Sequence, residues 1–305
     1  MRVGIIDIGT NTFHLLIVDR NDENQILHKE KVAVRIGKNG ISKGYISDDA
    51  IDRAIETLSN FRSKLIQYQV DETIATATSA VRNAENKQEF IEAIKETTGI
   101  NVNVLTGEEE AFLIYQGVKE FIDIQETALI MDIGGGSIEF ILADADEIKW
   151  LQSYEIGGQR IIDQFHQSDP IQNSEITALQ SFLDETLVEM VAKTKEYGAK
   201  YLIGSSGSFD TFWDMHTAIH PENIMDDPIL LKSELQTINK ALVSKTRDER
   251  LAIPGMISMR VDMIVGASIV TQYVMNSCHF DEVKISPFAL KEGVLYHGLP
   301  DKNKA

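Results

Sequence analysis

LIMDIGGGSIEF, residues 129–140, repeats the plan of an earlier stretch, IIDIGTNTFHLL, residues 5–16. In both, an apolar run ends at an aspartate that is followed by isoleucine and glycine. Aligning residues 3–18 with 128–143 places Asp7 on Asp132 and Gly9 on Gly134, an offset of 125 residues. An offset of this length is that of a duplicated domain, because solenoid repeats have periods of about 20 to 50 residues. The chain is therefore predicted to contain two copies of one fold.

The sequence that follows each copy also matches. Short apolar runs separated by turns, at 20–24 in the first copy and 145–147 in the second, predict antiparallel hairpins that continue into a third extended run. Each half is then expected to read β-β-β-α-β-α-β-α. The expected helices span 47–68, 86–98, 107–121, 174–197, several segments between 207 and 276, and a last one from about 288; the expected strands span 73–78, 101–105, 201–204 and 282–286.

This order predicts an α/β protein with a mixed sheet flanked by helices in each half. We expect two domains, residues 1–124 and 125–305, with a cleft between them.

Composition limits the class of protein. A hydrophobic content of 43% and a charged content of 25% are typical of a globular chain. No apolar run approaches the ~20 residues that span a bilayer. Because there is a single cysteine, Cys278, no internal disulfide can form, and a cytoplasmic protein is expected. The net charge of −18 argues against nucleic-acid binding.

One segment opposes this acidic balance. Residues 29–44 carry five basic residues against the single acid Glu30; the bases are Lys29, Lys31, Arg35, Lys38 and Lys43. The segment is either a solvated hairpin or a basic floor for a polyanionic ligand.

The two Asp-Ile-Gly loops predict a phosphate clamp. Small residues after a strand let backbone N–H groups face a phosphate without side chains in the way. Carboxylates at the strand ends could hold Mg²⁺ mainly through water. The expected phosphate-binding residues are Gly9, Thr10, Asn11, Thr12, Gly134, Gly135, Gly136 and Ser137, and the expected metal ligands are Asp7, Asp132 and Glu139. A single such loop could also be a tight hairpin turn, but a turn does not explain the matched pair.

Three further features admit both a functional and a structural interpretation. Glu110 heads an apolar helix face that continues through Ile114, Gly117 and Phe121, so it is either a buried general base or one more acid at a helix start, where Thr106 and Glu109 already fit a capping box. Arg82, in an expected loop, suits phosphate but is also typical of a surface. The turn Gly204, Ser205, Ser206 and Gly207 could approach a phosphate or cap a helix.

The ordered stretches DIGTNTFHL (7–15), TSAVRNA (78–84), TGEEEA (106–111), DIGGGSIE (132–139), GSSGS (204–208) and RVDMIVGA (260–267) resemble the Ppx/GppA phosphatase family of the actin/Hsp70/sugar-kinase superfamily. The resemblance covers nearly the whole chain and implies the duplicated actin-like, ribonuclease H-like fold. It implies Glu110 as catalytic base, Arg82 as phosphate-binding arginine, and metal and phosphate-loop roles for Asp7, Asp132, Gly134 and Glu139.

Two departures from the family qualify this resemblance. Longer members continue into a helical region resembling HD phosphohydrolases, so this chain is expected to be a two-domain short form, for which processive handling of long polymers is not implied. GSSGS also carries serine where many members have threonine, which leaves the role of this loop open.

The leading hypothesis is a Mg²⁺-dependent phosphohydrolase that removes the terminal phosphate of inorganic polyphosphate or guanosine pentaphosphate. A kinase of the same superfamily and a non-catalytic actin-like nucleotide-binding protein are the alternatives. The sequence does not rank the two substrates, predicts neither a nucleic-acid nor a membrane partner, and leaves the oligomeric state open, a homodimer included.

Overall fold

Two mixed sheets form the framework of the computed structural model, which describes residues 1–221 and 228–300. The first sheet has the strand order β3-β2-β1-β4-β5, in which β1 pairs antiparallel with β2 and parallel with β4. Its strands are β1 (Arg2–Ile8), β2 (Phe13–Asp19), β3 (Gln25–Val32), β4 (Glu72–Ala77) and β5 (Val102–Val104).

The second sheet repeats this plan. Its order, β10-β11-β9-β6-β7-β8, is that of the first sheet with one antiparallel strand, β10, added at the edge. Its strands are β6 (Ala128–Ile133), β7 (Ile138–Ala143), β8 (Ile148–Tyr154), β9 (Leu202–Ser205), β10 (Ile229–Leu231) and β11 (Glu282–Ser286). The duplicated α/β fold expected from the sequence is therefore confirmed.

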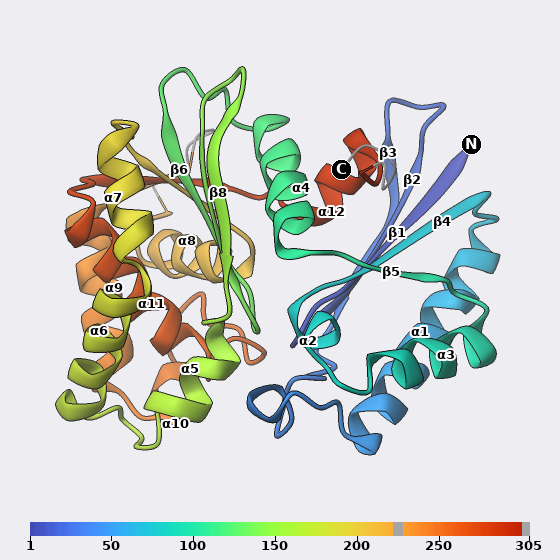
Figure 1. Cartoon of the computed structure of the whole chain (residues 1–305), viewed down its shortest axis with the longest axis horizontal. Coiled ribbons are helices and arrows are strands. Elements are labelled where there is room, and N and C mark those ends of the chain that lie inside the picture. The colour runs from blue at the N-terminus through green and yellow to red at the C-terminus, as the bar shows by residue number, and fades with distance from the viewer. Residues whose placement is uncertain (222–227, 301–305) are drawn as a thin grey trace.

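Helices flank both sheets, and two of them lie between the sheets (Figure 1). The first half has α1 (Asp48–Gln67), α2 (Ser79–Arg82), α3 (Lys87–Thr98) and the 3₁₀ turn η1 (Ile41–Lys43). The second half has α5 (Gly158–Phe165), α6 (Asn173–Thr186), α7 (Val188–Glu196), α8 (Gly207–Ile219), α9 (Lys232–Ser244), α10 (Arg247–Leu251) and α11 (Ile264–Ser277). The helices between the sheets are α4 (Gly107–Lys119) and α12 (Leu290–His297).

The packing of α4 against α12 joins the two halves. Their buried side chains share one core with residues of β1 and β2 from the first sheet and of β6 and β7 from the second. The two backbones touch: a Cβ on Gly117 would lie 2.1 Å from the Ala289 carbonyl oxygen, and one on Gly293 would lie 1.8 Å from that of Leu113. Only glycine permits this approach. The proposed boundary at residues 124 and 125 falls just after α4, whose side chains belong to this shared core.

Local signals in the sequence account for the start and end of several helices. The capping box of Thr106 and Glu109 at the start of α4 is confirmed, with the Glu109 N–H donating to Thr106 Oγ1 at 3.1 Å. Gly99 ends α3 in the left-handed region at φ 71°, as its place in the sequence predicts. None of the helices in the described residues is long and apolar enough to cross a membrane.

Several sequence expectations are corrected. The expected helix 174–197 is two helices, broken at Leu187. Helix α4 ends at Lys119, so Phe121 lies beyond it and is 41% exposed. Arg82 ends the short helix α2 instead of lying in a loop. Residues 29–44 are not a hairpin, because β3 stops at Val32 and the chain then folds into turns and η1. The edge strand β10, only three residues long, was not expected.

Candidate active site

The two Asp-Ile-Gly hairpins face each other across a cleft between the sheets, with a cavity volume of about 120 Å³. Each hairpin follows the first strand of its sheet, β1 or β6. In both, the loop glycine N–H donates to a carbonyl three residues later: Gly9 to Thr12 at 3.1 Å, and Gly134 to Ser137 at 3.0 Å. The matched sequences therefore form matched loops, and these loops meet at one cleft.

The loops approach each other so closely that side chains are excluded. A Cβ on Gly136 would lie 2.6 Å from Thr10 Oγ1, and one on Gly135 would lie 2.3 Å from Asn11 Nδ2. The predicted phosphate-binding residues of both loops line the cleft: Gly9, Thr10, Asn11, Thr12, Gly134, Gly135, Gly136 and Ser137. The loops thus bring backbone groups and small polar side chains of both halves together at the cleft.

Carboxylates are concentrated at this cleft, and burial disfavours their charge. Burial raises the pKa of Asp7 to about 7, and Asp132 opposite adds repulsion. Burial likewise raises the pKa of Asp132. Glu139 is not among the described residues that line the cleft, but it pairs with Asp132 in the β6–β7 register, and its pKa is raised to about 7 by burial and by Asp132. Buried acids that repel one another are typical of sites that bind a cation or carry out proton transfer.

The carboxylates of the cleft fit a Mg²⁺ ion that takes its remaining ligands from water and substrate phosphate. Among residues 1–221 and 228–300, no three or more His, Cys, Asp or Glu side chains are spaced to hold a metal ion directly. Mg²⁺ commonly binds through one or two carboxylates, water and substrate phosphate. Asp7 and Asp132 on opposite sides of the cleft match that donor set. Glu139 accepts a hydrogen bond from Ser153 Oγ at 2.7 Å, so its carboxylate already has a partner in the protein.

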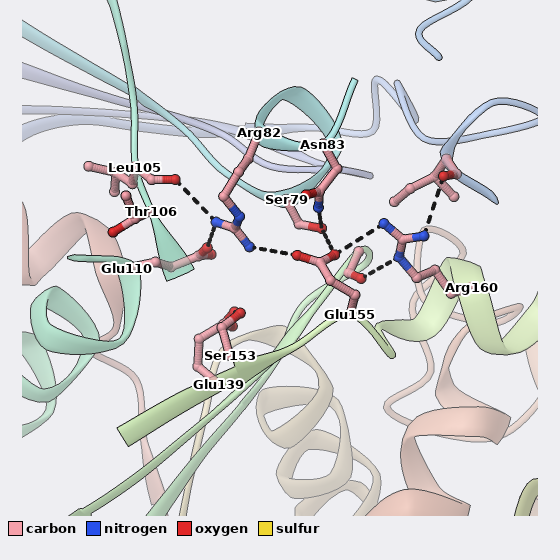
Figure 2. A network of polar contacts seen from close by, with 12 residues as sticks. Ser79, Arg82, Asn83, Leu105, Thr106, Glu110, Glu139, Ser153, Glu155 and Arg160 are labelled. Carbon is pink, nitrogen blue, oxygen red and sulfur yellow. Dashed lines mark hydrogen bonds and ion pairs between the residues drawn. The ribbon is translucent and has the colours of Figure 1, made fainter. Parts of the chain in front are cut away.

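Glu110 lies in the wall of the same cleft and is paired with Arg82 (Figure 2). Arg82 Nη1 donates to Glu110 Oε2 at 2.7 Å and to the Leu105 carbonyl at 3.2 Å. Burial raises the pKa of Glu110 well above its ordinary value, and the Glu139 charge adds to this, while Arg82 acts in the opposite direction. The structure therefore places the predicted base and the predicted arginine in contact, and α4 directs Glu110 into the cleft.

Basic side chains complete the cleft, and sequence reasoning gave no role to most of them. The cleft is also lined by Lys31 of β3, by Arg260 of the segment before α11, and by Lys291 of α12. The acid Asp210 of α8 lines it as well. Arg260 is 9% exposed, and its Nε has no hydrogen-bond partner within the described residues; the same holds for Asn11 Oδ1. A buried guanidinium with an unused donor is suited to an anion. Arg260 begins the RVDMIVGA stretch, which was the signal that could have identified it.

The GSSGS turn enters the site only in part. Ser206 and Gly207 line the cleft, whereas Gly204 and Ser205 are not among the described residues that form its wall. Gly204 packs against the Phe209 ring, which a Cβ would approach to 2.1 Å. Ser205 Oγ donates to Asp132 Oδ2 at 2.9 Å and thereby orients that carboxylate. Ser206 occupies the cap position of α8, but its side chain makes no capping hydrogen bond.

The basic segment also contributes only in part. Lys31 lines the cleft, and Lys29 lines an adjoining hollow. Lys38 and Lys43 are exposed, and Arg35 lies 3.9 Å from Asp262 in an ion pair between the two halves.

Comparison with known proteins identifies the family. The chain matches the Ppx/GppA phosphatase family over residues 16–302. It is 44% identical to a Cytophaga hutchinsonii exopolyphosphatase of known crystal structure, with a TM-score of 0.93 and 97% of each chain covered. Exopolyphosphatase 1 of Mycobacterium tuberculosis is 28% identical over 98% of this chain and 88% of its own length. Guanosine-5'-triphosphate,3'-diphosphate pyrophosphatase of Aliivibrio fischeri is also 28% identical, over 97% of this chain and 59% of its own length. The chain belongs to the Ppx/GppA phosphatase family and shares the fold of its solved members.

Proposed function

We propose that the chain hydrolyses the terminal phosphoanhydride bond of inorganic polyphosphate or of guanosine pentaphosphate. The observation that carries this proposal is the meeting of both Asp-Ile-Gly loops, Asp7, Asp132 and Glu110 at a single cleft. Phosphoryl transfer requires mainly positioning and electrostatic stabilisation from a protein. Hydrolysis requires an attacking water, a base and an anion clamp, and the cleft offers candidates for the base and the clamp.

Glu110 is the proposed general base, which orients the attacking water and takes its proton. Burial makes its carboxylate more basic than an exposed glutamate, and the Arg82 guanidinium favours the ionised form that a base requires. Arg260 and the loop residues line the cleft, and Arg260 and the loop N–H groups are the proposed partners of the phosphoryl oxygens. Arg82 borders the cleft through its ion pair with Glu110 and is proposed to contribute its charge from there. Their charges and dipoles would offset the negative charge of the transition state.

Asp7 and Asp132 are the proposed residues that hold Mg²⁺, with Glu139 in support. When bound, the ion would offset charge on the phosphate oxygens and would relieve the repulsion between these acids. The cleft needs such compensation, because Lys31, Arg260 and Lys291 share it with Asp7, Glu110, Asp132 and Asp210. Without a cation, a polyanionic substrate would meet an excess of carboxylates.

Orthophosphate release from polyphosphate and from guanosine pentaphosphate, measured side by side with Mg²⁺ present, tests this function. We expect release from at least one of the two, and the ratio of kcat/KM values identifies the preferred substrate. ATP with water alone and with candidate sugar or acid acceptors serves as the control for kinase activity. Phosphate transfer to an acceptor, without hydrolysis of either proposed substrate, would contradict the proposal.

A further inference from the structure

A carboxylate outside the cleft, that of Glu155, is surrounded by donors from both halves of the chain (Figure 2). Glu155 follows β8. It accepts a hydrogen bond from Ser79 Oγ at 2.6 Å and forms ion pairs with Arg82 Nη2 and with Arg160 Nη2, each at 3.1 Å. Ser79 and Arg82 belong to α2 of the first half, and Arg160 belongs to α5 of the second half. Two arginines and a hydroxyl, from one helix of each half, thus converge on one anionic group.

This donor set is suited to a phosphate group. Guanidinium groups bind phosphate and carboxylate through the same forked geometry, and a phosphate offers more oxygens and more charge than a carboxylate does. The side chains of Arg82 and Arg160 are only 15% and 14% exposed, whereas that of Glu155 is 38% exposed. The donors are therefore fixed in the protein, and the anion they hold is the most accessible member of the group.

The group also lies where a phosphate could reach it. Arg82 and Glu155 line a hollow of about 420 Å³, together with Ser153 and residues at the start of α4. The Arg82–Glu110 ion pair separates this hollow from the cleft, since Glu110 lines the cleft and Arg82 lines the hollow. The Arg82 guanidinium would lie between a phosphate bound here and the proposed base, Glu110.

We propose that Arg82, Arg160 and Ser79 form a second phosphate-binding subsite, which Glu155 fills when no phosphate is bound. The inference rests on the proposed function and deepens it. The ligand is a phosphate group, either the orthophosphate product or a phosphate of the substrate chain. Glu155 then acts as a competitor: its charge must leave the two arginines before a phosphate can take its place.

Calorimetric titration of the full chain with orthophosphate, with Mg²⁺ present, tests the subsite without relying on turnover. Glu155→Gln removes the competing charge at almost unchanged size, and we expect it to bind orthophosphate about fivefold more tightly or better, the value of one partly exposed ion pair. Glu108→Gln is the matched control. Glu108 lines the same hollow but, within the described residues, receives no hydrogen bond from either arginine, so its loss should leave affinity within about twofold.

Two further measurements identify where the phosphate binds and whether it comes from the product or from the substrate chain. Ser79→Ala in the Glu155→Gln background should remove most of the gain, because it deletes one donor of the subsite. The KM for tripolyphosphate should fall in Glu155→Gln if the subsite takes a phosphate of the chain; if only orthophosphate binds there, product inhibition becomes stronger and KM does not change.

Equal orthophosphate affinity in the wild type and Glu155→Gln, an equal gain in Glu108→Gln, or a gain that survives Ser79→Ala would overturn the proposal. If Glu155→Gln fails to fold, a crystal structure of the wild type at saturating phosphate decides, because Glu155 must then have left both arginines. A chain that binds orthophosphate as expected but hydrolyses neither polyphosphate nor guanosine pentaphosphate would contradict the proposed function and leave the subsite intact.

Discussion

At the scale of the residue, Glu110 combines burial with a cationic partner, Arg82. It is 6% exposed, faces the cleft and is hydrogen-bonded by Arg82 at 2.7 Å. Glu109, its neighbour in sequence, is used to cap the helix, and Glu108 is exposed. These three consecutive acids have three different environments, because the turn of the helix places them on different sides of it.

Glu110→Gln should lower kcat by about 100-fold or more, because an amide cannot accept the proton of the attacking water. Steady-state phosphate release measures this loss. Glu108→Gln changes the same charge two residues away and should retain normal turnover. If the Glu110 variant keeps near-normal kcat, another group is the base.

Asp7 should make the metal-free protein less stable as the pH rises. Its pKa is about 7 in the folded chain and 3.8 as the ordinary value, so between these values the folded state holds a proton that the unfolded state has lost. The free energy of unfolding therefore falls as the pH rises through this window, by up to about 4 kcal/mol at ~1.4 kcal/mol per pKa unit.

Thermal unfolding of wild type and Asp7→Asn in EDTA, between pH 4 and pH 8, checks this expectation. The variant should lose less stability across the window than the wild type, and Mg²⁺ added at pH 8 should raise the Tm of the wild type more than that of the variant. Parallel pH profiles for the two proteins would show that Asp7 is not the group responsible.

At the scale of the element, features formed by residues close together in the sequence were predicted, and features formed by distant residues were not. The two hairpins, the capping box at Thr106 and the glycine at the end of α3 were predicted because the residues that form them are close in sequence. Lys291 and Arg260 were given no role, because only the return of α12 and the segment before α11 brings them to loops more than a hundred residues away. Glu155 pairs across 73 residues with Arg82, and nothing near it in the sequence indicates this.

The crossing of α4 and α12 should tolerate no side chain at Gly293. Gly293→Ala places a Cβ 1.8 Å from a backbone oxygen of α4, so the helices must separate, at a cost of about 1–3 kcal/mol. Because α4 carries Glu110 and α12 carries Lys291, kcat should fall as well. Gly266→Ala in α11 is the control: the nearest atom, 2.7 Å away, belongs to the Ile161 side chain and not to a backbone, so α4 and α12 need not separate. Urea unfolding compares the two, and equal losses would contradict the importance of this crossing.

At the scale of the whole molecule, the chain carries a net charge of −18 and yet belongs to a family of phosphatases, whose substrates are anions. The arrangement reconciles the two facts. Each half contributes one strand-end aspartate and one loop to the cleft, and basic groups from β3, α12 and the segment before α11 gather there. Neither half contains a complete site, so both halves must act together.

Mg²⁺-dependent orthophosphate release by the wild type, Asp7→Asn and Asp132→Asn tests this requirement most directly. Each variant removes the carboxylate of one half, and we expect each to lower kcat/KM on the better substrate by about 100-fold or more. Circular dichroism spectra that match the wild type would show that both variants are folded. If either folded variant hydrolyses its substrate at the wild-type rate, the reaction does not take place between the two loops.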